Sequence, residues 1–185
     1  LLLAECYAGL PPGVVNVVTG GAATGEALVR HPKVDLIAFT GSVAAGRKIA
    51  AQAGQDLKKL NLELGSVDPF IVFADADLDV AVPGVAWARL LNAGQVCTSS
   101  KRIYLLQPIA EEFTRRVVDY VRTLKVGDPM DPTTDIGPLI SREALETVER
   151  QVAEAVKQGA KLILGGNRFQ PNGLKGYYFE PTILT

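Results

Sequence analysis

Short apolar runs alternate with amphipathic segments along the whole chain. In the first third, the apolar runs at 14–18, 34–39 and 57–64 predict strands, and the segments 25–30 and 43–53 predict helices. Residues 1–8 read as the end of a helix, because Gly9 and the prolines after it are typical stop signals. Near-continuous apolar strands separated by helices predict an α/β fold, with a parallel sheet covered on both faces.

The remainder of the chain repeats this alternation. Strands are predicted at 70–73, 102–106, 161–164 and 177–184, and amphipathic helices at 109–125 and 142–158. A further helix is expected to begin after Asp77, whose side chain can cap it, and to run toward residue 92. The loop 65–69 is the best candidate for a domain boundary, so we expect two parts, 1–64 and 65–185.

Composition narrows the function classes. The chain has 185 residues, 48% hydrophobic and 21% charged, as is typical of globular proteins. Its 19 basic and 20 acidic residues are well mixed, which argues against nucleic acid or an anionic membrane surface as a partner. No stretch approaches the roughly 20 apolar residues that span a bilayer. We therefore expect a small molecule or another protein as the partner.

Cysteine usage points to a reducing compartment, and we expect a cytoplasmic protein. The two cysteines, Cys6 and Cys97, show no CxxC spacing, and the chain has one histidine. Neither a disulfide framework nor a metal site is predicted from this set.

A glycine and a hydroxyl stand between the predicted strand 34–39 and the helix 43–53. Free backbone N–H groups and the helix dipole would favour a phosphate beside Gly41 and Ser42. Alternatively, Gly41 only shapes a turn and Ser42 only caps the helix. Neither this segment nor the glycine turn at 20–25 has the GxGxxG spacing of a dinucleotide fingerprint.

Two single residues could carry chemistry. Cys97 lies in a loop of small and polar residues, where backbone N–H donors could favour a thiolate, although free cysteines are often simply buried apolar residues. Glu63 ends an apolar run, where desolvation would suit a general base, although the alternation Leu62, Glu63, Leu64 also fits a strand with glutamate facing water.

These signals together resemble the aldehyde dehydrogenase superfamily over nearly the whole chain. Glu63 precedes Cys97 by 34 residues, which is similar to that family's spacing between base and nucleophile. The matching segments are PPGVVNVVTG at 11–20, HPKVDLIAFTGS at 31–42, LELG at 62–65, PFIVFADADLDVAV at 69–82, NAGQVC at 92–97, GDPMDPTTDIGPLIS at 127–141, GAKLILGG at 159–166 and FEPTILT at 179–185.

The resemblance implies a mechanism. Cys97 would attack an aldehyde as thiolate, and the thiohemiacetal would pass a hydride to NAD or NADP and become a thioester. Glu63 would activate the water that releases the carboxylate, and the backbone N–H of Cys97 would supply half of an oxyanion hole. The cofactor residues that the resemblance implies are Gly21, Gly41, Ser42, Gly46, Leu64 and Gly65.

The resemblance also implies the domain roles. Residues 1–64 would form the second half of a Rossmann-like cofactor domain, and 65–185 most of an α/β catalytic domain. Because its only methionine is Met130, we expect the chain to be an internal fragment. The resemblance implies that the parent is a homo-oligomer, a dimer or tetramer, and that this fragment is inactive alone. Ser66 departs from the usual LELGG, and the glycine turn at 20–25 is one residue short. These departures leave an inactive dinucleotide-binding or structural module as the alternative.

Overall fold

The computed structural model describes residues 2–171 and 173–185, and the chain divides into two units, Leu1–Gly65 and Ser66–Thr185. The elements of the first unit are α1 (Leu2–Glu5), α2 (Ala22–Arg30), β1 (Leu36–Thr40), α3 (Val43–Gln55) and β2 (Lys59–Glu63). The predicted helices and two of the three predicted strands are therefore present, with shifted ends.

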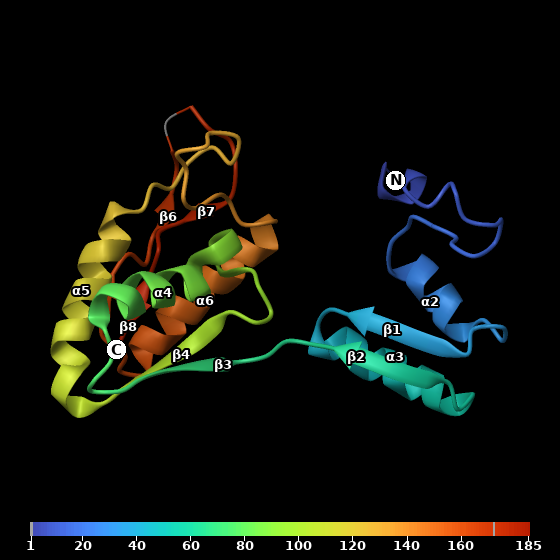
Figure 1. Ribbon diagram of the computed structural model, residues 1–185, viewed down its shortest axis with the longest axis horizontal. Helices are drawn as coiled ribbons and strands as arrows, with labels where there is room; N and C mark the ends of the chain where they lie inside the picture. The colour runs from blue at the N-terminus through green and yellow to red at the C-terminus, as the bar shows by residue number, and fades with distance from the viewer. Residues whose placement is uncertain (1, 172) are drawn as a thin grey trace. The chain divides into compact units, whose positions relative to one another are not determined.

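The strands of the first unit form one parallel pair, in which Leu36 lies opposite Lys59 and Thr40 opposite Glu63. Helix α3 packs against both strands (Figure 1). Burial alternates along β1, so that Ile37 and Phe39 are partly covered while Leu36 is 55% exposed. In the described residues this pair is thus covered on one face, not on both as expected.

The prediction of a strand at 14–18 is wrong. The hydrogen bonds recorded for this stretch are local, from the Val14 N–H to the Pro11 carbonyl and from the Asn16 amide to the Gly13 carbonyl. Val14 and Val18 are 62% and 64% exposed. A β-branched run becomes a strand only when a neighbouring strand completes its ladder, and among the described residues this run has none.

The second unit carries most of the secondary structure. Strands β3 and β4 pair in parallel, whereas β5 with β8 and β6 with β7 are short antiparallel pairs. The predicted strand at 177–184 is divided into β7 and β8. The elements are β3 (Asp68–Val72), α4 (Leu78–Leu90), the 3₁₀ helix η1 (Leu91–Gly94), β4 (Ser100–Leu105), the 3₁₀ helix η2 (Gln107–Ile109), α5 (Ala110–Thr123), α6 (Arg142–Lys157), β5 (Leu162–Leu164), β6 (Arg168–Phe169), β7 (Tyr178–Phe179) and β8 (Ile183–Leu184).

The core of the second unit lies where α4 meets β3 and α5. The Asp77 carboxylate caps α4 as predicted, accepting from the Asp79 N–H at 2.9 Å. Val82 and Val85 of α4 form a buried cluster with Val72 of β3 and Phe113 of α5. This packing fixes α4 and therefore the point from which the following loop leaves (Figure 1).

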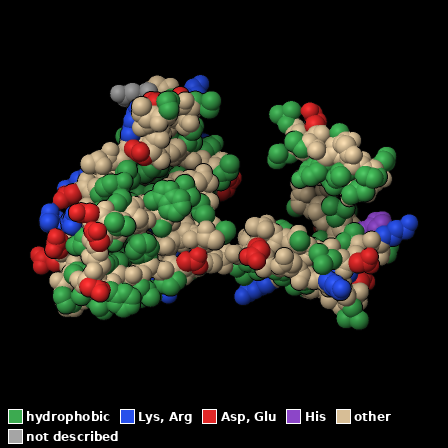
Figure 2. Space-filling view, in the orientation of Figure 1, with side chains coloured by type: hydrophobic (Ala, Val, Ile, Leu, Met, Phe, Trp, Pro, Cys, Tyr) green, Lys and Arg blue, Asp and Glu red, His purple; other side chains and the backbone are tan. Residues whose placement is uncertain are grey.

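Apolar side chains also lie on the surface of both units (Figure 2). No helix in the described part of the chain is long and apolar enough to cross a membrane.

Candidate active site

Cys97 lies in a sharply bent loop between α4 and β4, and it is exposed. The backbone leaves the helical conformation at Leu91, and in η1 the residues Asn92, Ala93 and Gly94 have positive φ angles of 51°, 55° and 75°. Left-handed backbone is disfavoured for Asn and more so for Ala, so the surrounding contacts must hold this reversal in place.

The side chain of Arg89 spans the reversal. Its Nη1 donates to the Gly94 carbonyl at 3.0 Å and to the Ser99 hydroxyl at 2.8 Å, and Ser99 is only 2% exposed. Burial lowers the pKa of Arg89 from its ordinary value, yet a guanidinium stays protonated at neutral pH. A Cβ at residue 94 would lie 2.6 Å from Nη1, so glycine allows this close approach. Arg89 thus ties the end of α4 to the residues after Cys97.

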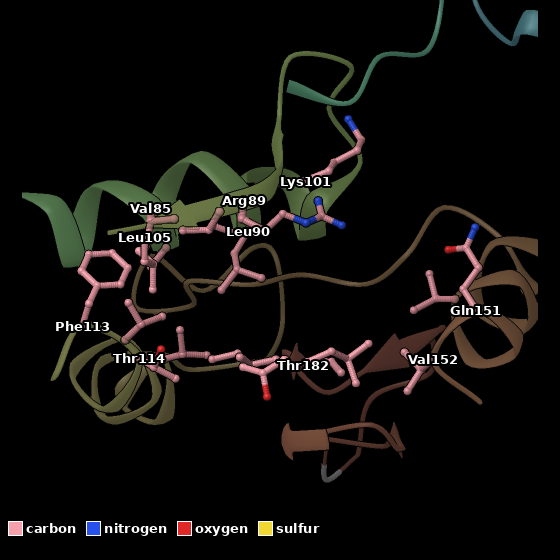
Figure 3. A pocket seen from close by; sticks show the side chains of 18 residues that line it. Val85, Arg89, Leu90, Lys101, Leu105, Phe113, Thr114, Gln151, Val152 and Thr182 are labelled. Atoms are coloured by element: carbon pink, nitrogen blue, oxygen red, sulfur yellow. The ribbon is translucent and has the colours of Figure 1, made fainter. Parts of the chain in front are cut away.

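Lys101 holds the same loop from the start of β4. Its Nζ donates to the carbonyls of Val96 at 3.4 Å, Cys97 at 3.1 Å and Ser99 at 3.3 Å. The two cations, Arg89 and Lys101, also line one edge of a cavity of about 410 Å³ whose other walls are mainly apolar (Figure 3). The cysteine therefore projects from a loop whose carbonyls are bound by an ammonium group.

Gln95 fastens the loop to a distant segment. Its Nε2 donates to the Asn92 carbonyl at 3.0 Å, and its Oε1 accepts from the Ile140 N–H at 2.9 Å. Arg89, Gln95 and Lys101 were not among the residues predicted for the site. Gln95 stands inside the NAGQVC segment, but nothing in the pattern of the sequence marks the other two.

Glu63 ends β2 in the first unit. Its backbone carbonyl accepts from the Gly41 N–H at 3.0 Å, which brings two predicted site residues together. The Glu63 side chain is exposed, so the desolvation expected for a general base is not found in the described structure of this unit. Glu63 therefore faces water at the end of a strand, which is the alternative interpretation drawn from the sequence.

The start of α3 combines both interpretations of the Gly41–Ser42 step. The Ser42 hydroxyl accepts from the Ala45 N–H at 3.2 Å, so Ser42 does cap the helix. The N–H groups of Val43 and Ala44, at the first two helical positions, have no acceptor within α3. Capping therefore leaves donors at this end of a 13-residue helix that an anion could use.

The other predicted cofactor residues fall into two groups. Gly46 is buried in α3, and a Cβ there would lie 2.6 Å from a methyl carbon of Leu64, so these two are in close contact. Gly21 is the N-cap of α2, and Gly65 is exposed with open space around it. Ser66, which follows, donates its hydroxyl to Asp68.

Two glycines of α3 allow a matched test of the packing at Gly46. Gly46→Ala should lower the free energy of unfolding by roughly 1 kcal/mol, because overpacking against Leu64 outweighs the gain in helix propensity. Gly54→Ala, in the same helix but with no atom within 4 Å of the new Cβ, should raise it by about 0.5 kcal/mol. Urea unfolding measures the free energy of unfolding of both variants and of Gly46→Ala combined with Leu64→Ala. Equal effects at the two glycines would contradict the packing described.

Metal ligands are not gathered anywhere in the described residues: no group of three or more His, Cys, Asp or Glu side chains is placed to hold an ion. The chemistry available at the two candidate residues is that of a thiol and a carboxylate.

Comparison with known proteins places these residues in a family. The model of the aldehyde dehydrogenase family matches residues 1–185. The human 4-trimethylaminobutyraldehyde dehydrogenase is 45% identical over 190 residues, covering 100% of this chain and 38% of the human protein. This chain therefore spans about 38% of the length of that relative.

Solved structures agree in fold. An NADP-dependent enzyme of Escherichia coli shares 42% identity with a TM-score of 0.91, over 98% of this chain and 38% of its own. An aldehyde dehydrogenase from Bacillus cereus, solved as a complex with NAD⁺, shares 35% identity with a TM-score of 0.90, over 96% of this chain and 36% of its own. The α/β fold is that of these enzymes, and the chain belongs to the aldehyde dehydrogenase family.

Proposed function

We propose that this chain supplies the nucleophile and the general base of an enzyme that oxidises an aldehyde to a carboxylate with NAD or NADP. The observation that carries the proposal is the exposed thiol of Cys97 on a loop braced by Arg89 and Lys101. A braced loop suits a nucleophile, because the attacking atom must be held in a defined position. Membership of the aldehyde dehydrogenase family supports the same assignment.

The first unit fits a dinucleotide. The uncapped N–H groups at the start of α3 suit the pyrophosphate, with Gly41 and Ser42 forming the turn and Gly46 admitting Leu64 close to the helix. Gly21 at the start of α2, together with Leu64 and Gly65 after β2, completes the proposed cofactor-binding set. When bound, NAD or NADP would accept a hydride from the substrate.

Cys97 would act first. Its thiolate adds to the aldehyde carbon, a C–S bond forms, and the carbonyl electron pair moves to the oxygen. The backbone N–H of Cys97 stabilises that oxyanion. Loss of hydride from the same carbon leaves a thioester on Cys97, so that the aldehyde is oxidised while the cofactor is reduced.

Glu63 would act second. Its carboxylate takes a proton from a water molecule as the water oxygen attacks the thioester carbon. The C–S bond then breaks, the thiolate of Cys97 is restored, and the acid leaves as its carboxylate. Since an oxidised Cys97 could not attack, a reducing compartment such as the cytoplasm is part of this proposal.

The proposal is tested by assaying aldehyde oxidation in the full-length protein. By full-length protein we mean this chain within its native polypeptide. We expect aldehyde-dependent formation of reduced nicotinamide, followed by its absorbance, with a panel that includes cationic, anionic and neutral aldehydes and with each cofactor. Acid should form in equal amount. If no aldehyde gives a signal with either cofactor, although the protein is folded, an inactive module of the same fold takes the place of this proposal.

A further inference from the structure

We propose that Lys101 is a positioning residue, which aims the backbone N–H of Cys97 at the oxygen of the reacting aldehyde. This inference rests on the thiol mechanism proposed above. It concerns a side chain that does not itself touch the substrate and acts through the peptide groups on either side of Cys97.

The argument begins with the peptide between Val96 and Cys97. The described part of the chain contains no cis peptide bond, so the Val96 carbonyl and the Cys97 N–H point in opposite directions from one planar group. The Val96 carbonyl accepts from Lys101 Nζ at 3.4 Å and from the Ser99 N–H at 3.2 Å. The Cys97 N–H must therefore point away from the ammonium group.

The next peptide is fixed in the same way. The Cys97 carbonyl accepts from Lys101 Nζ at 3.1 Å, so the Thr98 N–H also points away from Lys101. One ammonium group thus binds both carbonyls beside the thiol and, together with the Ser99 N–H at the first of them, sets the direction of two successive N–H donors. Donors aligned before the reaction stabilise developing negative charge without reorganising.

The chemistry of lysine suits this arrangement. An ammonium group has three donors, and all three hydrogen bonds recorded for Lys101 go to loop carbonyls, the third being that of Ser99. Arg89 binds Gly94 and the Ser99 hydroxyl independently, so the reversal before Cys97 keeps a second support if Lys101 is replaced. Removing the ammonium should therefore loosen the two peptides without unfolding the loop.

Lys101→Met in the full-length protein tests the inference, with two rates measured side by side. We expect kcat/KM for aldehyde oxidation to fall about 30-fold, less than the hundredfold or more that follows complete loss of an oxyanion donor. Removing a nearby ammonium group also changes the fraction of thiolate at a given pH, so alkylation of Cys97 by iodoacetamide is compared at the alkaline plateau of its rate. There it should stay within about twofold of wild type, because displacement at a saturated carbon develops no oxyanion.

Conservative and distant variants complete the test. Lys101→Arg, which keeps a cationic donor, should recover part of kcat/KM, and Lys157→Met, an exposed lysine at the end of α6, should not change it. For each variant, kcat/KM and the alkylation rate are divided by the folded fraction, which is measured by thermal unfolding. Unchanged kcat/KM in Lys101→Met, or an equal fall in oxidation and alkylation, would overturn the inference. A wild-type protein without aldehyde oxidation would instead refute the proposed function.

Discussion

Replacement of Cys97 by serine is expected to abolish aldehyde oxidation by the full-length protein, with kcat falling by about 10⁴-fold or more, as when other enzymes lose their nucleophile. A serine hydroxyl is not ionised near neutral pH, so it attacks an aldehyde far more slowly than a thiolate does. An ester in place of the thioester would also release its acyl group more slowly.

Cys6 provides the matched control. It is the other cysteine of the chain and is likewise exposed, yet it follows α1 in the first unit, away from any candidate residue in the sequence. Steady-state assays should find Cys6→Ser indistinguishable from wild type. A Cys97→Ser variant that keeps its rate, or a Cys6→Ser variant that loses it, would remove Cys97 from the mechanism.

Glu63→Gln is expected to separate the two halves of the reaction. Glutamine has the shape of glutamate but cannot take a proton from water, so the first turnover should still reduce one cofactor per site. Steady-state turnover should then fall by about 10²-fold or more, the usual contribution of a general base. Stopped-flow absorbance of the reduced nicotinamide would record a burst followed by a nearly flat phase.

Two additions sharpen this experiment. Hydroxylamine attacks thioesters without help from a base, so it should restore turnover in Glu63→Gln. Glu26→Gln removes an exposed glutamate of α2 in the same unit and should show no burst beyond that of wild type. If Glu63→Gln instead lost the burst itself, Glu63 would be acting before the thioester forms.

The long helices of this fold could be predicted well, because their apolar residues recur at helical spacing over several turns. Helices α5 and α6 lie within two residues of the segments predicted at 109–125 and 142–158, and α3 begins where the cap Ser42 indicates. Local capping chemistry also predicted the start of α4 at Asp77.

Strand pairing and burial could not be predicted in this way. The run at 14–18 has the composition of a strand, but a ladder needs a partner, which no local pattern contains. The exposed carboxylate of Glu63 shows the same limit, because desolvation depends on what tertiary structure lays over the strand end. Glu63 could be proposed as a candidate base from the sequence, whereas its exposure could not be predicted.

The contacts that brace the Cys97 loop could not be predicted from the sequence, for a different reason. Arg89 and Lys101 bind mainly to backbone carbonyls, and any residue type can present a carbonyl. Such contacts leave no signature in spacing or composition. Cys97 could thus be proposed as the nucleophile from its motif, whereas the side chains that hold its loop are found only in the structure.

Mass spectrometry of a trapped intermediate is the most direct measurement of all. Glu63→Gln in the full-length protein is mixed with aldehyde and oxidised cofactor, quenched in acid and digested. A covalent thioester mechanism predicts that the peptide bearing Cys97 gains the mass of the acyl group, in an amount equal to the burst, and loses it on treatment with hydroxylamine. An acyl group on another residue, or a full burst with Cys97 unmodified, would contradict that mechanism.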